Sequence, residues 1–316
     1  MIKLLITDGI EKSAATMLSE KGYQLVEKSC TPDELKKELQ DCDAIIIRSA
    51  TKMTKEFIDA AKQTGRLSLI VRAGVGVDNI DVAYAQKNGV AVCNTPCASS
   101  LAVAELTIGH MFALARKIYS ANASMHSGRW EKKKLEGVEL AGKTLGVIGF
   151  GHIAKEVARL ASLIGMKVVY HTRSGRKDGY DQYEFVSMDE LLKRSDFISL
   201  HIPYDKTAGA AIGEKEFEMM KDGVFLINCA RGGVVNEAAL ISALDSGKVT
   251  AAAVDVFEEE PTHNERLFTH EKVCLTPHIG ASTAEAQQKI GMEIVSIVDG
   301  FFEKGQNERI DKQKAM

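Results

Sequence analysis

The chain has 316 residues, of which 45% are hydrophobic and 26% charged, and its formal net charge is -3. That length suits two domains, and that composition is typical of a folded globular protein. The small net charge excludes a strong general attraction to nucleic acid or to an anionic membrane, and no apolar run approaches the ~20 residues that cross a bilayer. We therefore expect neither nucleic acid nor a membrane as a partner.

The cysteines and the first residues indicate where the protein works. The six cysteines lack the paired spacing of a zinc site, so no metal is expected. Met1-Ile2-Lys3 opens directly into an apolar run, without the charged and then apolar leader of an export signal. Free cysteines without an export signal favour a reducing cytoplasm.

The amino-terminal third alternates between strands and helices. Apolar, β-branched runs predict strands at Ile2–Thr7, Tyr23–Val26, Ala44–Arg48, Leu69–Ala73 and Val90–Val92. The helical stretches between them are Glu11–Glu20, Pro32–Gln40, Thr54–Lys62 and Val82–Asn88. Such alternation predicts a mostly parallel sheet with helices on both faces.

The middle of the chain begins with a long apolar stretch. Ser99–Tyr119 has the spacing of one long helix, and we expect a domain boundary near Pro96. The polar segment His126–Val138, which contains the only tryptophan, Trp130, is expected to be a surface connector. Later strands are expected at Phe197–Leu200, Val224–Asn228, Ala251–Asp255 and Val273–Leu275. Later helices are expected at Glu214–Met220, Asn236–Ser246 and Ser282–Gly300, followed by a loose charged tail at Lys304–Met316.

The stretch Lys143–Arg173 contains a nucleotide-binding signature. The strand Thr144–Ile148 runs into Gly149-Phe150-Gly151-His152-Ile153-Ala154, and helical spacing then continues to Gly165. In this βαβ setting Gly149 permits the tight turn, Gly151 lets the backbone approach a pyrophosphate, and Ala154 lets the helix pack closely on the strand. The helix amino terminus then faces the phosphate charge. The stretch therefore predicts a dinucleotide site, with a ligand-free glycine-rich turn as the less favoured alternative.

Three polar loops follow expected strands in the second half. They are Asn228–Gly233, Asp255–Pro261 and Pro277–Thr283. Because the carboxyl ends of parallel strands share one edge, an arginine, several carboxylates and a histidine should meet beside the nucleotide. That set suits hydride transfer at a carbonyl carbon: a histidine delivers the proton, a carboxylate orients it, and an arginine binds the substrate anion. Two other histidines, His110 and His201, are interpreted as structural.

Six motifs occur in order along the chain: IIIRSATKMT, RAGVGVDNID, the GFGHIA turn, NCARGGVV, VDVFEEEP and PHIGASTAEAQ. With them the chain resembles the D-isomer-specific 2-hydroxyacid dehydrogenases, and among these the short phosphoglycerate dehydrogenases most. The resemblance implies an α/β fold with two doubly wound parallel-sheet domains. A Rossmann NAD(P)-binding domain, residues 99–283, would be inserted into a flavodoxin-like substrate domain made of residues 1–98 and 284–316.

The resemblance also implies which residues contact ligands. His278 would be the general acid/base, Glu260 would orient it, and Arg231 would grip the substrate carboxylate. The residues expected to bind the cofactor are Gly149, Gly151, His152, Ile153, Thr172, Arg173, Ile202, Cys229, Ala230, Asp255 and Gly280. The residues expected to bind the substrate are Arg48, Ala73, Gly74 and Val75, with Lys132–Lys134 as further candidates for a phosphate.

Two positions depart from the family pattern. NAD-using members carry an acid for the ribose hydroxyls where this chain has Thr172, followed by Arg173. Without a carboxylate, and with a cation beside it, the site can accept a 2′-phosphate, so we hypothesise that NADP is accepted and slightly favoured over NAD. The alternative is a solvated turn in an NAD enzyme. Val75 stands where phosphoglycerate dehydrogenases often carry threonine, which puts one contact in doubt.

The favoured interpretation is an NAD(P)-dependent oxidoreductase that converts D-3-phosphoglycerate to 3-phosphohydroxypyruvate in serine biosynthesis. The alternative within the family is an NADPH-dependent glyoxylate/hydroxypyruvate reductase. A remote alternative of another class is a nucleotide-sensing, corepressor-like binding protein. The resemblance further implies a homodimer built on the nucleotide domain.

Overall fold

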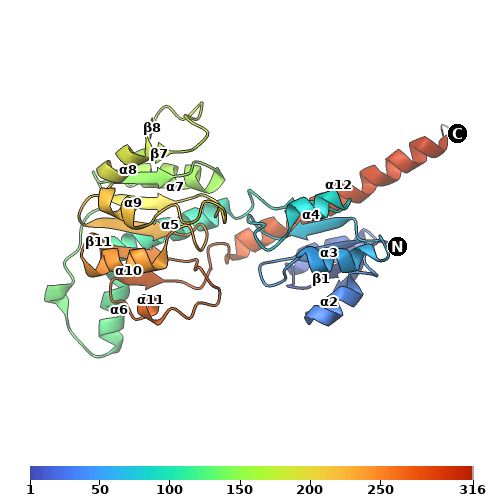
Figure 1. Cartoon of the computed structure of the whole chain (residues 1–316), viewed down its shortest axis with the longest axis horizontal. Coiled ribbons are helices and arrows are strands. Elements are labelled where there is room, and N and C mark those ends of the chain that lie inside the picture. Colours follow the sequence, from blue (N-terminus) through green and yellow to red (C-terminus); the bar gives the residue numbers. More distant parts are fainter. Residues whose placement is uncertain (315–316) are drawn as a thin grey trace. The chain divides into compact units, whose positions relative to one another are not determined.

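The structure is a computed structural model that describes the backbone of residues 1–314 and the side chains of residues 1–303. It divides into two compact units, Met1–Ser99 with Ala281–Met316, and Ser100–Gly280. Figure 1 shows that each unit is a sheet with helices on both faces. The predicted α/β class, with two parallel-sheet domains, is thereby confirmed.

The first unit contains a five-stranded parallel sheet with the order β2-β1-β3-β4-β5, which is the flavodoxin-like order. Its strands are β1 (Lys3–Ile6), β2 (Gln24–Glu27), β3 (Ala44–Ile47), β4 (Leu69–Arg72) and β5 (Ala91–Asn94). Its helices are α1 (Lys12–Glu20), α2 (Pro32–Glu38), α3 (Lys55–Lys62), α4 (Val82–Lys87) and α12 (Ala284–Lys314). A capping box forms at the start of α2, where Thr31 and Glu34 satisfy each other's backbone N–H groups.

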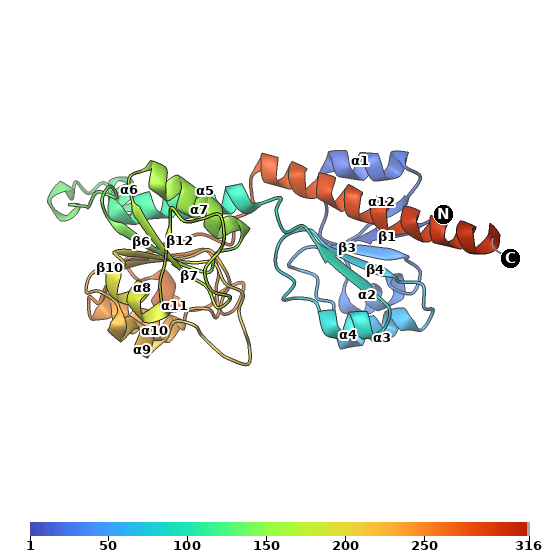
Figure 2. The same cartoon turned by 90° about the horizontal axis from the view of Figure 1, so that it is seen from above.

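The carboxy-terminal helix α12 completes the first unit. Its buried residues Ile290, Ile294 and Val298 pack with Leu4 and Ile6 of β1 in one apolar cluster. Figure 2 shows α12 beside α1 on this face of the sheet, and the two helices are in close contact. Burying each such aliphatic side chain contributes about 1.5–3 kcal/mol, so the sheet of the first unit depends on a segment from the far end of the chain.

The second unit contains a seven-stranded parallel sheet with the order β12-β11-β10-β9-β6-β7-β8. Its strands are β6 (Thr144–Ile148), β7 (Lys167–His171), β8 (Glu184–Phe185), β9 (Phe197–Leu200), β10 (Val224–Asn228), β11 (Val249–Val254) and β12 (Val273–Leu275). The chain order reverses between β6 and β9, which is the Rossmann arrangement. In such sheets ligands bind beyond the strand carboxyl ends at this reversal.

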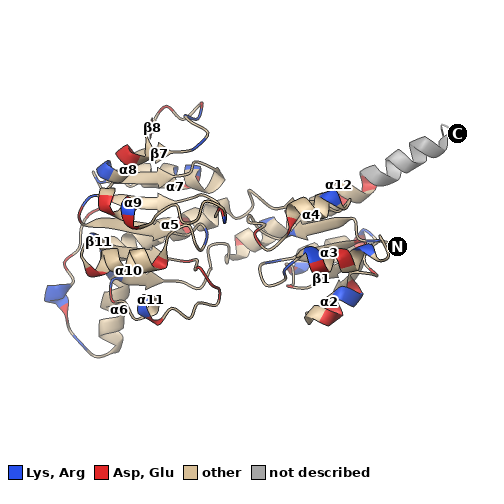
Figure 3. Ribbon diagram, in the orientation of Figure 1, with Lys and Arg blue, Asp and Glu red and all other residues tan. Residues whose placement is uncertain are grey.

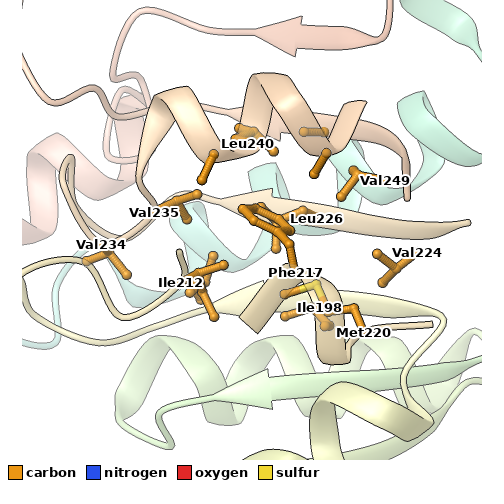
Figure 4. Packing of buried hydrophobic residues seen from close by; sticks show 14 of the residues in the cluster. Ile198, Ile212, Phe217, Met220, Val224, Leu226, Val234, Val235, Leu240 and Val249 are labelled. Atoms are coloured by element: carbon orange, nitrogen blue, oxygen red, sulfur yellow. The ribbon is translucent and has the colours of Figure 1, made fainter. Parts of the chain in front are cut away.

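Helices cover both faces of the second sheet. The helices are α5 (Ser100–Ala115), α6 (Ile118–His126), α7 (His152–Leu163), α8 (Met188–Arg194), α9 (Glu214–Met219), α10 (Glu237–Asp245) and α11 (Glu265–Phe268), with a short 3-10 turn η1 (Lys132–Lys134). One face packs on α5 and α7. The opposite face packs on α8 to α11, and Figure 4 shows Phe217 and Leu240 from two of these helices meeting Leu226 of β10. The strand residues alternate between the two clusters, as a sheet buried on both faces requires.

Several sequence predictions of local structure were wrong. The expected single helix Ser99–Tyr119 is two helices, α5 and α6, which are separated at Lys117, where φ is 52°. The final helix does not end at Gly300 but continues to Lys314. The side chains of the expected charged tail lie outside the described residues. The elements β8, α8 and α11 were not anticipated, and they have two, seven and four residues.

Charged side chains lie mainly on the helices and loops, while the strands are largely uncharged (Figure 3). Among the described residues, no helix has both the length and the apolar character needed to cross a membrane. Within the same part of the chain, no three histidine, cysteine or acidic side chains gather as ligands for a metal ion.

Candidate active site

Gly149 makes the turn that follows β6. Its φ is 90°, and a Cβ atom at this position would lie 2.4 Å from the carbonyl oxygen of His201. Since His201 follows β9, the backbones of the two strands at the reversal of the sheet come into contact here. A side chain would force these strand ends apart, and its backbone would also be strained. Glycine is therefore required at the reversal of the strand order, which is where ligands bind in sheets of this kind.

The amino terminus of α7 can accept an anion. Gly151 is the N-cap residue, and no described side chain caps the helix. A Cβ atom on Gly151 would meet no atom within 4 Å, so the space in front of the helix is open. His152 and Ile153 form the first turn, whose N–H groups have no partners within the helix. Together with the helix dipole, these groups fit the pyrophosphate of a nicotinamide dinucleotide.

The loop after β7 contains the residues expected to face the adenosine ribose. The Thr172 hydroxyl accepts a hydrogen bond from the Ser174 N–H at 3.1 Å and lies 2.8 Å from the Ser174 hydroxyl. Lys177 donates to the Ser174 hydroxyl at 2.7 Å, and Arg173 is exposed. Sequence analysis did not single out Ser174 or Lys177, because no known spacing marks them. The loop thus gathers hydroxyls and cations where an NAD site would have a carboxylate.

His278 and Glu260 meet at the carboxyl edge of the second sheet. Glu260 lies in the loop after β11 and His278 in the loop after β12, and His278 Nδ1 is 2.7 Å from Glu260 Oε2. The other carboxylate oxygen of Glu260 accepts the Phe257 N–H at 3.1 Å. Because a carboxylate only accepts hydrogen bonds, His278 carries its proton on Nδ1. Nε2 is then the nitrogen that can exchange a proton with a substrate.

The pKa of the Glu260 carboxyl lies below its ordinary value of 4.5. Burial is the largest single effect and opposes this shift, but the hydrogen bond and charge of His278, the Phe257 N–H and the charge of Arg231 together outweigh it. Glu260 is therefore a carboxylate that accepts a hydrogen bond from His278 Nδ1, and Arg231 is close enough to act on the charge of Glu260. The structure brings the three predicted catalytic side chains to one edge.

The loop that bears Arg231 is fixed by its own polar contacts. Asn228, which is 3% exposed, accepts a hydrogen bond from the Ala230 N–H at 3.1 Å and donates to the Arg231 carbonyl oxygen at 3.1 Å. The backbone of Gly232 then touches the neighbouring loop, since a Cβ atom there would lie 1.6 Å from the Phe257 carbonyl oxygen. Asn228 thus shapes the loop that carries the arginine, a role that its position at a strand end did not reveal.

The remaining cofactor candidates lie at this same edge. Ile202 follows β9, and the buried pair Cys229 and Ala230 follows β10. Burial raises the pKa of the Cys229 thiol to about 12, so it is not a nucleophile. Asp255 follows β11 and is 1% exposed, and its carboxylate accepts the Gly280 N–H at 3.0 Å. Its expected contact with the cofactor stays a prediction.

The expected substrate residues lie in the first unit. The backbone N–H of Arg48 donates to Asp8 Oδ2 at 2.7 Å. In the turn of Ala73, Gly74 and Val75, Gly74 has a φ of 144°, and a Cβ atom on it would lie 1.4 Å from an Arg72 guanidinium nitrogen. The same guanidinium donates to the Ala73 carbonyl oxygen at 3.1 Å. Arg72 therefore covers this turn, a role that its place in the motif RAGVGVDNID did not indicate.

The lysines that are further candidates for a substrate phosphate lie in the second unit, away from the catalytic loops in the sequence. Lys132–Lys134 form η1, after α6, and Lys134 pairs with Glu131 at 3.1 Å. The loops of Arg231, Glu260 and His278 instead follow β10, β11 and β12. Among the described residues, no hydrogen bond or ion pair joins these lysines to Arg231, Glu260 or His278.

The chain matches a known protein family and several known proteins. The family described as D-isomer specific 2-hydroxyacid dehydrogenase, NAD binding domain, matches residues 108–280. A hydroxypyruvate reductase from Thermotoga maritima is 45% identical over 294 residues, which cover 92% of this chain and 95% of that protein. The chain belongs to the D-isomer-specific 2-hydroxyacid dehydrogenase family. The resemblance inferred from the motifs is thus confirmed, and the family places the chain among the oxidoreductases.

Two further similarities agree with this family assignment. A D-3-phosphoglycerate dehydrogenase from Methanocaldococcus jannaschii is 44% identical over 303 residues, covering 92% of this chain and 56% of that protein. The chain thus spans about half the length of that relative. The crystal structure of a glyoxylate reductase from Paecilomyes thermophila superimposes with a TM-score of 0.89 at 33% identity, covering 96% of both chains. Residues 108–280 of the second unit match the NAD-binding domain of this family.

Proposed function

We propose that this protein transfers a hydride between a nicotinamide cofactor and a D-2-hydroxy acid. The observation that carries the proposal is the 2.7 Å contact between His278 and Glu260 at the carboxyl edge of a nucleotide-binding sheet. The cofactor, when bound, supplies or accepts the hydride. His278 Nε2 gives a proton to the carbonyl oxygen in reduction and takes it back in oxidation. Arg231 binds the substrate carboxylate through its planar guanidinium.

The most direct test of this activity is the absorbance of the reduced cofactor in the presence of a panel of 2-keto acids. We expect oxidation of NADH or NADPH by at least one of them, and its loss in His278→Asn. If the nucleotide binds but no keto acid is reduced, the protein is a nucleotide-sensing binding protein of the corepressor-like kind. The complete pair of Glu260 and His278 favours the enzyme.

For the substrate, we propose D-3-phosphoglycerate, which would be oxidised to 3-phosphohydroxypyruvate as in serine biosynthesis. Arg48 is the residue proposed to bind the phosphate, because guanidinium groups bind phosphate through two parallel hydrogen bonds. Relatives with the name D-3-phosphoglycerate dehydrogenase support this choice. The relative named hydroxypyruvate reductase supports the alternative substrate, which lacks the phosphate.

Arg48→Ala separates these two substrates. If the phosphate is bound by Arg48, the KM for 3-phosphohydroxypyruvate rises by about 10–100-fold, which corresponds to the 1.5–3 kcal/mol of a charged hydrogen bond. The KM for hydroxypyruvate stays unchanged, and Arg48→Lys, which keeps the charge, loses less. An unchanged KM in Arg48→Ala, with hydroxypyruvate as good a substrate, would favour the glyoxylate/hydroxypyruvate reductase.

For the cofactor, we propose that NADP is accepted and slightly favoured over NAD. The support is the loop after β7, where Thr172, Ser174 and Lys177 form a polar cluster beside the exposed Arg173. Kinetics with both cofactors test the proposal. A kcat/KM at least about tenfold higher with NADH, equivalent to ~1.4 kcal/mol, would reject it.

For the assembly, we propose a homodimer in the reducing cytoplasm. Exposed apolar side chains gather on α5 and α6: Phe112, Ile118 and Met125 are 40%, 53% and 55% exposed and line one hollow of about 540 Å³. Such a patch on a soluble protein marks an interaction surface. Sedimentation should give twice the chain mass, and Ile118→Asp should shift it to one chain. The cysteines, all free in the described residues, support the compartment.

A further inference from the structure

A chain of polar side chains lies beneath the loop of His278, within the second unit. Thr276, at the end of β12, has its hydroxyl 2.6 Å from Asp255 Oδ1 and 3.1 Å from His110 Nε2. His110, on α5, has its other ring nitrogen 3.8 Å from the sulfur of Cys274. His110 is 3% exposed and Asp255 is 1% exposed, so water does not compete strongly for these contacts.

The chemistry of these groups fixes the direction of every hydrogen bond. A carboxylate only accepts, so the Thr276 hydroxyl donates its single proton to Asp255. The hydroxyl must then accept from His110, which carries its proton on Nε2. The Nδ1 lone pair of His110 is left to accept from the Cys274 thiol. Burial lowers the pKa of His110, against the smaller opposing effect of Asp255, which keeps the ring neutral in this tautomer.

This chain of hydrogen bonds holds the residues on both sides of His278. The Asp255 carboxylate also accepts the N–H groups of Ile279 and Gly280, at 2.9 and 3.0 Å. The N–H of His278 donates to the Thr276 carbonyl oxygen at 3.0 Å. His278 itself has a φ of 53°, a left-handed conformation that costs energy for a residue other than glycine. The surrounding contacts must therefore hold His278 in place.

We propose that Thr276 is a positioning residue, held by His110 and acting through Asp255, that keeps His278 in the conformation in which it meets Glu260. The inference deepens the proposed function and rests on His278 as the proton donor. Without the Thr276 hydroxyl, Asp255 loses one donor and the His110 N–H loses its acceptor. The loop can then relax from the left-handed conformation, and the imidazole moves out of register with Glu260.

The matched pair Thr276→Val and Thr276→Ser tests this role. The valine variant keeps the shape and removes the hydroxyl, while the serine variant keeps the hydroxyl. For Thr276→Val we expect kcat to fall by about 10–100-fold, since a displacement of ~1 Å costs about 10²-fold, with the KM for the keto acid and the dissociation constant of the cofactor within about 3-fold of the wild type. Thr276→Ser should recover kcat to within about 3-fold.

Several outcomes would overturn the proposal. One is a wild-type kcat in Thr276→Val, and another is a loss of cofactor binding as large as the loss of kcat, which would make Asp255 a cofactor contact only. If the valine variant does not fold, the nitrogen chemical shifts of His110 in the wild type decide: a proton on Nδ1, or on both nitrogens, contradicts the hydrogen-bond direction. If the wild type reduces no keto acid, the proposed function is refuted instead. The measurement of the His110 tautomer does not depend on enzyme activity, so the two failures can be distinguished.

Discussion

The contact between Gly232 and Phe257 predicts the effect of a single methyl group on catalysis. In Gly232→Ala, the new Cβ atom would lie 1.6 Å from the Phe257 carbonyl oxygen and 2.2 Å from its carbonyl carbon. Ordinary van der Waals contact begins at 3.4 Å, so the two loops must separate by about 1.8 Å, which is 3.4 minus 1.6. Both partners are backbone, so no side-chain rotation can relieve the clash.

The two loops carry different catalytic groups, and this decides the size of the effect. Arg231 precedes Gly232, and Glu260 follows Phe257, so their separation moves the arginine away from the carboxylate and the imidazole. A displacement of ~1 Å costs about 10²-fold in rate, so we expect kcat/KM to fall by at least about 10²-fold. Overpacking of this kind also costs about 1–3 kcal/mol of unfolding free energy.

The assay is oxidation of the reduced nicotinamide cofactor by the best keto acid, together with thermal unfolding of the same samples. Gly300→Ala is the matched control, because Gly300 lies within α12 and a Cβ atom there would meet no atom within 4 Å. We expect it to keep full activity and to gain about 0.5–1 kcal/mol of stability from the better helix former. Wild-type kcat/KM and stability in Gly232→Ala would refute the reasoning.

Three further predictions concern the catalytic side chains. His278→Asn should lower kcat by about 10²–10⁴-fold in steady-state kinetics, and a smaller loss would argue against acid-base catalysis by this residue. Arg231→Lys should chiefly raise KM, because the charge remains while the bidentate grip is lost; a fall in kcat alone would contradict this. Glu260→Gln should reduce activity and change the unfolding free energy by no more than ~1 kcal/mol, because the side chains of His278 and Glu260 are 39% and 35% exposed. Because folding lowers the pKa of Glu260, the carboxylate stabilises the protein above the ordinary pKa of 4.5, and this stabilisation is lost as the pH falls through the lower pKa of the folded state. The unfolding free energies of the wild type and Glu260→Gln should therefore converge at acid pH.

The sequence predicted those parts of the site that depend on strand ends. The loops of Arg231, Glu260 and His278 each follow a buried strand, and parallel strands bring such loops to one edge whatever the details of packing. The nucleotide turn was predictable for a similar reason, because Gly149 and Gly151 stand between a strand and a helix at fixed spacing. The local pattern contains enough information for both features.

Other features depend on contacts that no local pattern reveals. The stretch Ser99–Tyr119 is apolar at helical spacing throughout, and a lysine at position 117 gives no signal of the left-handed conformation that divides it. The contact of His110 with Thr276 joins residues 166 positions apart in the sequence, so no local pattern indicates it. The two-residue strand β8 is too short for any alternation to be seen, and it forms only by pairing with β7.

The dependence of the first sheet on α12 has a consequence for synthesis on the ribosome. The apolar face formed by Leu4, Ile6, Leu69 and Val71 is synthesised more than 200 residues before the side chains of Ile290, Ile294 and Val298 that cover it. At the usual ~5–20 residues per second, the nascent chain carries this uncovered face for about 10–40 s while the whole of the inserted unit is translated. During that interval the nascent sheet is a natural client for a chaperone, whereas the inserted unit, being continuous, can fold as soon as it has left the exit tunnel.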